Sequence, residues 1–229
     1  MQGTDCNIES CFLCQSCIPA WRAAIAASKQ TLAFRKGEVI FREGDKVQGI
    51  FFLYEGAVKV HQSWEEQKEL ILRFATAGDV IGLRGIGDTY PVTATALDDT
   101  RLCFIDNVFY EASLQTNPSL TYKMMQRYAL ELQQAELRMR NLAHMEVKGR
   151  IAAALLDLKQ VFGLDKEKYI ALAVTRQDIA SYAGAAYETV FKFFVELTNE
   201  NIIATSGKHI KILNETALKN YVKQPGKGA

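Results

Sequence analysis

The sequence predicts an α+β fold, with an antiparallel β-roll or barrel first, one long helix next and a smaller helical domain last. Between Thr31 and Ile105, short β-branched and aromatic runs alternate with glycines, as in roll and barrel proteins. After Pro118, no glycine or proline occurs up to Lys148, which is typical of a long helix. A chain of 229 residues is long enough for one large domain or two modest ones.

Five runs of β-forming residues identify strands of the roll, and five glycines separate them. The runs are Glu38–Phe41, Ile50–Tyr54, Ala57–Val60, Leu70–Phe74 and Val92–Thr95, and the glycines are Gly37, Gly44, Gly56, Gly78 and Gly82. Glycine is favoured at turns that need a positive φ, so these residues predict the ends of the strands. Before the roll, residues 1–20 are expected to be irregular and Trp21–Ser28 to form a short helix.

The long helix carries an a/d heptad seam, in which apolar residues alternate spacings of four and three. Its members are Thr121, Met125, Tyr128, Leu132, Ala135, Met139 and Leu142. Such a seam either packs on its own domain or pairs with its copy in a homodimer, and the length of the helix favours the homodimer. The charged residues that flank the seam could tune the pairing: Arg127, Glu131, Glu136, Arg138 and Arg140.

Gly149 is expected to end the long helix, and an amphipathic helix, Ile151–Phe162, follows it. Tyr169–Leu172 is expected to be a short strand. Residues Ile202–Ala204 and His209–Leu213 are expected to form a hairpin around Gly207.

Between these elements lies the spacing of a helix-turn-helix. Thr175 suits the N-cap of a helix that ends at Ala183, Gly184 suits the turn, and Ala186–Asn199 forms the second helix. We expect four residues of this helix in the core, namely Val190, Phe193, Phe194 and Leu197, and five near its exposed N-terminal part, namely Tyr187, Glu188, Thr189, Phe191 and Lys192. Glutamate can accept from cytosine N4 and lysine can reach guanine O6 or N7, although an ordinary amphipathic surface helix carries similar residues.

Composition limits the class of protein. Net charge is +1, so DNA affinity would need a local basic surface. No run approaches the roughly 18 apolar residues that span a bilayer, and residues 1–10 hold two acids and no base, so we expect a cytoplasmic protein. The sequence has no phosphate loop, no nucleophile–base pairing and no His/carboxylate metal cluster, so we do not expect an enzyme.

Four of the five cysteines, Cys6, Cys11, Cys14 and Cys17, read C-x4-C-x2-C-x2-C, and Cys103 follows on an expected strand. The compact C-x2-C-x2-C spacing is seen where a loop wraps a [4Fe–4S] cube. Structural zinc and a dithiol redox switch remain alternatives, and an isolated strand cysteine is often a small buried hydrophobe. His61, His144 and His209 offer no evident axial arrangement for haem.

Several motifs resemble the CRP/FNR family of bacterial transcription regulators. They are Val174–Gly184 and Tyr187–Lys192 in the helix-turn-helix, and Phe34–Asp45, Gly56–Lys59 and Ala77–Gly82 in the roll. The resemblance implies a β-roll like a cyclic-nucleotide-binding domain, a dimerisation helix and a winged helix-turn-helix. The expected divisions are a sensor segment at 1–28, the roll at 29–116, the helix at 117–148 and the DNA-binding domain at 149–229.

The resemblance also implies a homodimer on a palindromic operator, with RNA polymerase as a partner. Phosphate contacts are carried over to Thr175, Arg176 and Gln177, and base contacts to Glu188 and Lys192. Two departures affect the half-site sequence: lysine at 192 lacks the fork of the usual arginine, and Phe191 replaces a residue that is often small.

For the sensor, the sequence resembles the FNR-like iron–sulfur branch at Cys17–Pro19 and Leu102–Ile105. This implies ligands Cys14, Cys17 and Cys103 with Cys11 as the fourth, although the cysteine gaps are shorter here and Cys6 is an alternative ligand. The implied signal is oxygen or nitric oxide. The rival interpretation is an effector in the roll with zinc on the cysteines.

No cyclic nucleotide is expected. Relatives that respond to cyclic AMP hold it with a glutamate and an Arg-Ser pair. The matching positions here are Leu83 and, approximately, Pro91 and Val92, which supply neither a cation for the phosphate nor an acceptor for the ribose hydroxyls.

Overall fold

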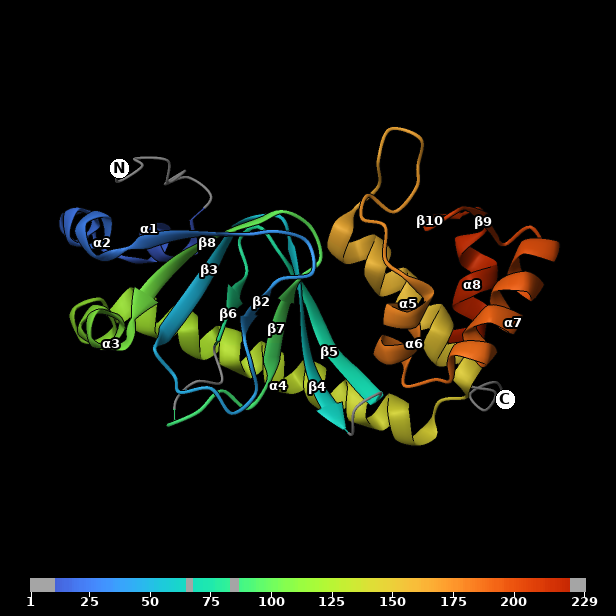
Figure 1. Ribbon diagram of the computed structural model, residues 1–229, viewed down its shortest axis with the longest axis horizontal. Coiled ribbons are helices and arrows are strands. Elements are labelled where there is room, and N and C mark those ends of the chain that lie inside the picture. Colours follow the sequence, from blue (N-terminus) through green and yellow to red (C-terminus); the bar gives the residue numbers. More distant parts are fainter. Residues whose placement is uncertain (1–10, 65–67, 83–86, 223–229) are drawn as a thin grey trace, which may run out of the picture. The chain divides into compact units, whose positions relative to one another are not determined.

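A computed structural model describes residues 11–64, 68–82 and 87–222 (Figure 1). The predicted α+β class is confirmed, with antiparallel sheets first, a long helix next and a helix-turn-helix domain last. The chain divides into two compact units, residues 1–62 with 72–134 and residues 63–71 with 135–229. Among the described residues, no helix is long and apolar enough to cross a membrane.

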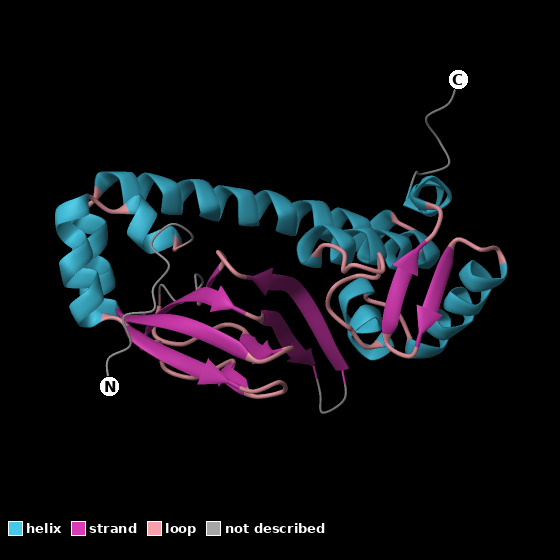
Figure 2. Cartoon of the chain, turned by 90° about the horizontal axis from the view of Figure 1, so that it is seen from above, coloured by secondary structure: helices cyan, strands magenta, loops and turns pink. Residues whose placement is uncertain are grey.

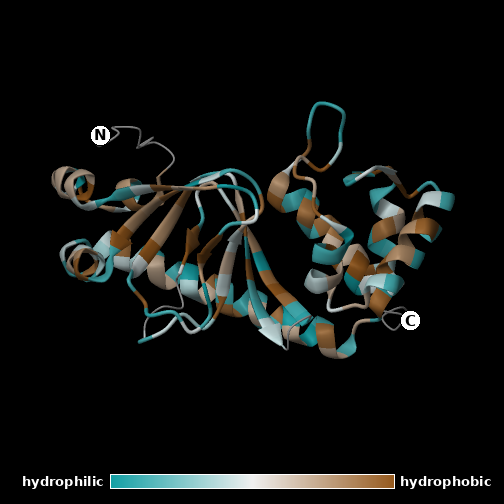
Figure 3. Ribbon diagram, viewed as in Figure 1, coloured by the Kyte–Doolittle hydropathy of each residue, from teal (hydrophilic) through white to brown (hydrophobic). Residues whose placement is uncertain are grey.

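In the described part of the roll, the strands form two four-stranded sheets. The first has the order β1 (Gln30–Phe34), β8 (Thr100–Asp106), β3 (Gly49–Glu55), β6 (Val80–Ile81), and the second β2 (Val39–Phe41), β7 (Thr93–Ala96), β4 (Ala57–Trp64), β5 (Lys68–Thr76). Each of the five predicted runs contributes to one of these strands. Hydrophobic residues occur mainly along the strands, and hydrophilic residues are frequent in the turns that join them (Figure 3).

The five predicted turn glycines all have positive φ. Gly56 shows why the residue type matters, because its φ is +92° and an added Cβ would lie 2.5 Å from the carbonyl oxygen of Asp99. A larger residue would therefore strain the turn between β3 and β4.

The N-terminal segment is more regular than expected. Residues that were expected to be irregular form α1 (Phe12–Ser16) and a 3-10 turn, η1 (Pro19–Trp21), and α2 (Arg22–Ser28) follows. Burial explains the difference: Leu13, Cys14 and Ser16 of α1 lie in the interior, and tertiary packing stabilises a helix that is too short to persist alone.

A second helix was missed at the end of the roll, α3 (Asn107–Thr116). Asp106 caps it, because the Phe109 N–H donates to its carboxylate at 2.9 Å. Asp and Asn before an apolar run are a start signal that the strand pattern of β8 obscured.

The long helix, α4 (Pro118–His144), spans 27 residues and ends earlier than expected. Helix α5 (Val147–Phe162) begins after Met145 and Glu146, so Gly149 does not end α4 but lies buried within α5. Gly149 is needed there for packing, because an added Cβ would lie 2.7 Å from the carbonyl oxygen of Tyr221.

In the C-terminal domain, α6 (Arg176–Ala183) and α7 (Tyr187–Asn199) are followed by the hairpin β9 (Ile203–Ser206) and β10 (His209–Ile212) and by α8 (Glu215–Val222) (Figure 2). The expected strand at Tyr169–Leu172 is wrong: only an isolated bridge joins Leu164 to Ile170. Asp165 accepts from the N–H groups of Glu167 and Tyr169, which folds this segment into a turn instead.

Candidate DNA interface and cysteine site

Capping residues define the ends of the first helix of the helix-turn-helix. The Asp178 N–H donates to the Thr175 hydroxyl oxygen at 3.0 Å, which fixes the start of α6. Gly184 ends α6 in the left-handed conformation, with φ of 59°. Both residues occupy the positions that the sequence predicts, and the hairpin β9–β10 completes a wing.

Helix α7 divides into the expected faces. Val190, Phe193, Phe194 and Leu197 are buried, whereas Tyr187, Glu188, Phe191 and Lys192 are exposed and Thr189 is half-buried. Tyr187 and Phe191 are 43% and 47% exposed, which is high for aromatic side chains. The N-terminal part of α7 is therefore free to enter a groove of about the width of an α-helix.

A groove of about 280 Å³ joins the N-terminus of α6 to α7 and the wing. Its polar lining is Thr175, Arg176, Gln177, Tyr187, Thr205 and Lys208. The guanidinium of Arg176 lies 5.4 Å from the Phe194 ring and 5.8 Å from the Phe191 ring, so it is anchored by aromatic faces. Helix N-termini attract phosphate, and a cation beside one strengthens that preference.

Lys208 is a residue of this groove that sequence reasoning missed. It follows Gly207 at the tip of the wing. A lysine next to the glycine of an expected hairpin is the sequence pattern that could have identified it.

The cysteines converge on one part of the roll. Cys11 precedes α1, Cys14 lies within it and Cys17 follows it, while Cys103 lies on β8. Cys14, Cys17 and Cys103 are only 4%, 6% and 7% exposed and belong to one hydrophobic cluster, against which Cys11 packs. The same cluster contains Leu120 and Met124 of α4. Cys6 lies outside the described residues.

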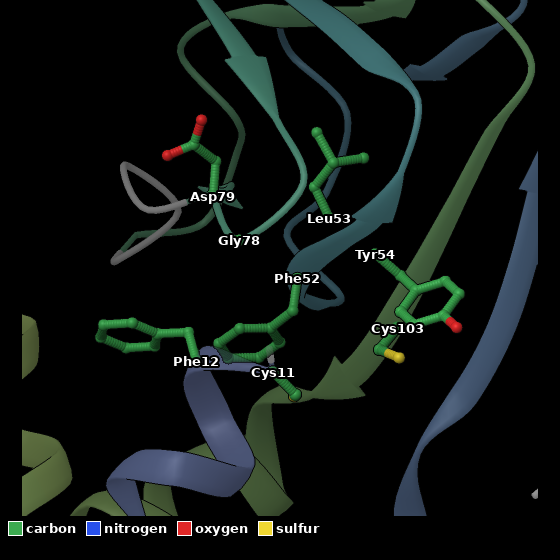
Figure 4. Close-up of a pocket in the computed structure, with 8 residues that line it drawn as sticks. All are labelled: Cys11, Phe12, Phe52, Leu53, Tyr54, Gly78, Asp79 and Cys103. Carbon is green, nitrogen blue, oxygen red and sulfur yellow. The ribbon is translucent and has the colours of Figure 1, made fainter. Parts of the chain in front are cut away.

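Cys11 and Cys103 line a common cavity of about 20 Å³ (Figure 4). Phe12, Phe52, Leu53, Tyr54, Gly78 and Asp79 complete its wall. Such a volume is about that of one water-sized sphere. Within the described ranges, no three His, Cys, Asp or Glu side chains are grouped as ligands of a metal ion.

Burial raises the pKa of the Cys17 thiol to about 11, and the neighbouring Cys11 adds to the rise. The Cys17 thiol should therefore stay protonated at pH 8 and react slowly. We expect iodoacetamide to label Cys11, which is half-buried, about tenfold faster than Cys17. Mass spectrometry of timed, quenched digests measures both rates, and equal rates would contradict this arrangement.

The seam of α4 is largely exposed in the single chain. Met125, Leu132 and Met139 are 62%, 61% and 66% exposed, Ala135 is exposed, and Thr121, Tyr128 and Leu142 are half-buried. The helix buries Leu120 and Met124 within its own unit, and of the seam Tyr128 packs against the same cluster, so packing against its own domain leaves most of the seam uncovered. An exposed apolar stripe of this kind marks an interaction surface.

Three of the charged residues expected to tune the pairing are engaged within the chain. Arg127 forms an ion pair with Asp79, Glu131 pairs with Arg73 at 3.3 Å, and Arg138 donates to backbone carbonyls. These three side chains therefore already form ion pairs or hydrogen bonds within the single chain.

A β-roll followed by a long helix and a winged helix-turn-helix defines the class of the protein: a DNA-binding transcription regulator, not an enzyme. Residues 31–117 match the family model of the cyclic nucleotide-binding domain, and residues 149–221 match that of the Crp-like helix-turn-helix domain. The chain belongs to the CRP/FNR family.

Two curated relatives and one solved structure illustrate what this chain is similar to. The transcriptional activator protein anr of Pseudomonas aeruginosa is 30% identical over 194 residues, 83% of this chain and 79% of its own. The cAMP-activated global transcriptional regulator CRP of Salmonella typhimurium is 29% identical over 177 residues, 76% of this chain and 84% of its own. The structure of FixK2 from Bradyrhizobium japonicum superposes with a TM-score of 0.78 at 26% identity, over 86% of this chain and 99% of that one.

Proposed function

We propose that this protein is a homodimeric regulator whose DNA affinity is controlled by an oxygen- or nitric-oxide-sensitive [4Fe–4S] cluster on Cys11, Cys14, Cys17 and Cys103. The observation that carries the proposal is the convergence of these four thiols on one hydrophobic cluster that also includes α4. The proposed divisions are a sensor segment at 1–28, a roll at 29–116, the dimerisation helix at 117–148 and the DNA-binding domain at 149–229. We place the protein in the cytoplasm, where thiols are kept reduced.

The donor set fits an iron–sulfur centre, because soft thiolates in dry surroundings suit such clusters. When bound, the cluster would supply a centre that oxygen or nitric oxide breaks down. The cavity beside Cys11 and Cys103 is only about 20 Å³, so α1 must move outward to admit a cluster. Holding four thiolates would also release protons, from the Cys17 thiol among others.

The residues around the cysteines connect the sensor to the dimer helix. Phe12 stacks on Phe52 with centroids 6.4 Å apart, and the guanidinium of Arg127 lies 5.9 Å from the Phe12 ring. Tyr128, a member of the seam, packs against the cysteine-containing cluster. A displacement of α1 therefore changes what supports α4 at its seam. Weaker dimerisation would weaken operator binding, because each chain reads one half-site.

At the DNA interface we propose that Thr175, Arg176 and Gln177 contact phosphates, while Glu188 and Lys192 contact bases and Tyr187 and Thr189 line the contact. Lys208 extends the phosphate contacts to the wing. The target is a palindromic operator, and RNA polymerase is the proposed further partner. The support is of two kinds: Thr175, Arg176, Gln177, Tyr187 and Lys208 line one groove, and Glu188 and Lys192 are exposed at the start of α7.

The test of the sensor is purification without oxygen, followed by iron and sulfide assays and by visible spectra before and after exposure to air. We expect a brown protein with about four iron and four sulfide per chain that bleaches in air and then binds operator more weakly. A colourless protein with about one zinc per chain would overturn the proposal.

A second candidate function is supported by the match to a cyclic nucleotide-binding domain and by the CRP relative. In it, the roll binds a small effector and the cysteines hold zinc or act as a thiol switch. Effector-dependent DNA binding that survives the triple change of Cys11, Cys14 and Cys17 to serine would favour it. Cyclic AMP is not the expected effector, because Pro91 is uncharged and Val92 is 3% exposed; Leu83 lies outside the described residues.

Base reading by Glu188 predicts a loss of specificity in a Glu188→Ala variant. The free energy of operator binding should become less favourable by about 1–3 kcal/mol, because a cytosine amino group loses its acceptor. The preference for one base pair at that position should also relax. Anisotropy titrations on operators selected from a random duplex pool measure this loss. Glu167→Ala, in an exposed loop, is the charge-matched control. If both variants bind alike, Glu188 does not read bases.

A further inference from the structure

The turn of the helix-turn-helix is held by two arginines from outside α6. A helix leaves its last carbonyls without partners in the helix, and at the end of α6 three successive carbonyls receive guanidinium donors. Arg138 of α4 donates to Tyr182 at 2.5 Å. Arg150 of α5 donates to Ala183 at 2.9 Å and to Gly184 at 3.0 Å.

The two arginines differ in where they come from. Arg150 also donates to the Met145 carbonyl at 2.7 Å, so it closes the junction between α4 and α5. Arg138 projects from α4 itself, and its guanidinium lies 4.2 Å from the Tyr182 ring centroid. The same group donates to the carbonyl of Ile71 on β5 at 2.5 Å. Arg138 thus binds α6 through both the backbone and the ring of Tyr182.

The surroundings of Arg138 make this contact specific. The Tyr182 hydroxyl lies 3.3 Å from the Asp157 carboxylate of α5, and burial raises the pKa of Tyr182 to about 12. Leu142, the last residue of the seam, also reaches the turn, because a Cβ on Gly184 would lie 2.7 Å from its Cδ2. The turn therefore rests on α4 through one polar and one apolar contact.

We propose that Arg138 is a positioning residue that holds the helix-turn-helix at a fixed angle to the last turns of α4, from Ala135 onward, and thereby sets the half-site spacing that the dimer accepts. An arginine suits the task, because one amino group of its planar guanidinium donates to two carbonyls while the face of the group stacks on an aromatic ring. The inference rests on the proposed homodimer but not on the iron–sulfur cluster. Two recognition helices read half-sites about one helical turn apart only if each is held at a fixed angle to the dimer helix.

The chain offers a matched control two residues away. Arg140 is an exposed arginine on the same helix, and its guanidinium donates to the neighbouring Asn141 side chain at 3.2 Å. Arg140→Met therefore removes the same charge from α4 as Arg138→Met without touching α6.

The test measures binding of the full chain to three kinds of duplex. These are the best palindrome that the unchanged chain selects from a random pool, versions with half-sites one base pair closer or farther apart, and a single half-site. For Arg138→Met we expect about tenfold weaker binding to the palindrome, a change within about twofold on the single half-site, and a flattened preference for spacing. Arg140→Met should match the unchanged chain.

Other outcomes separate the possible failures. An unaltered spacing preference in Arg138→Met overturns the proposal, as does an equal loss on the palindrome and the half-site, which indicates general destabilisation. If Arg138→Met does not fold, Tyr182→Leu, which removes the ring beneath the guanidinium, must flatten the preference or the proposal fails. Sedimentation of the unchanged chain tests whether it is a dimer. A monomer without spacing preference overturns both this inference and the proposed homodimer. The iron and sulfide assays test the cluster independently of this result.

Discussion

A Cys103→Ala variant purified without oxygen is expected to carry at least about tenfold less iron and sulfide than the unchanged chain. Cys103 is 7% exposed, belongs to the same buried cluster as Cys14 and Cys17, and lines a cavity with Cys11. Without its thiolate, three of the proposed ligands remain on the segment around α1 and none on the roll. DNA binding should then be weak with and without oxygen.

The matched control is Cys6→Ala, which should keep the full complement of iron and sulfide. The opposite pattern, a loss in Cys6→Ala and retention in Cys103→Ala, would assign the ligands to the four N-terminal cysteines. Folding is checked by the melting temperature, because removing one buried sulfur costs only about 1 kcal/mol where the site is apolar. A variant that melts with the unchanged chain but lacks iron isolates the role of the thiolate.

The second large effect is expected from Leu132→Glu, in the middle of the proposed seam. The side chain is 61% exposed in the single chain, so the fold should tolerate glutamate there. In a homodimer the change would bury two facing carboxylates, and we expect the dimer to weaken by at least about a hundredfold. Operator binding should collapse with it, which sedimentation and anisotropy titration measure in parallel.

Leu130→Glu is the control for this prediction. Leu130 lies on the same helix, outside the heptad seam, and is 58% exposed. It should leave both dimerisation and operator binding near their original values. Dissociation by Leu130→Glu, with Leu132→Glu unaffected, would place the pairing face on the other side of α4.

Much of the fold could be predicted because local chemistry determines it. A glycine with positive φ, such as Gly184, or an N-cap such as Thr175 marks the end of an element whatever surrounds it. Helix α1 and the turn at Tyr169–Leu172 could not be predicted, because their conformations depend on contacts that periodicity does not record. The predicted end of α4 was wrong because Gly149 is a packing residue within α5. From the sequence alone, a glycine indicates the end of a helix.

The candidate sites likewise contain features that the sequence predicts and features that it does not. The buried and exposed faces of α7 followed from its spacing, because one helix carries the whole pattern. The neighbourhood of Cys103 and α1 joins residues about ninety positions apart, which only tertiary structure brings together. Arg138 was expected to tune pairing, yet its hydrogen bonds reach α6 and β5, and a sequence does not reveal the direction of a long side chain.

The burial of the thiols has a consequence for how the protein survives damage. Oxidation of cysteine to sulfinic and sulfonic acids requires an accessible thiolate. Cys14, Cys17 and Cys103 are each less than a tenth exposed, so a chain without metal keeps these three sulfurs out of reach of peroxide. If the protein holds the proposed cluster, iron and sulfide alone would restore it after loss, without new synthesis. Under that proposal, one chain would serve through repeated cycles of aeration.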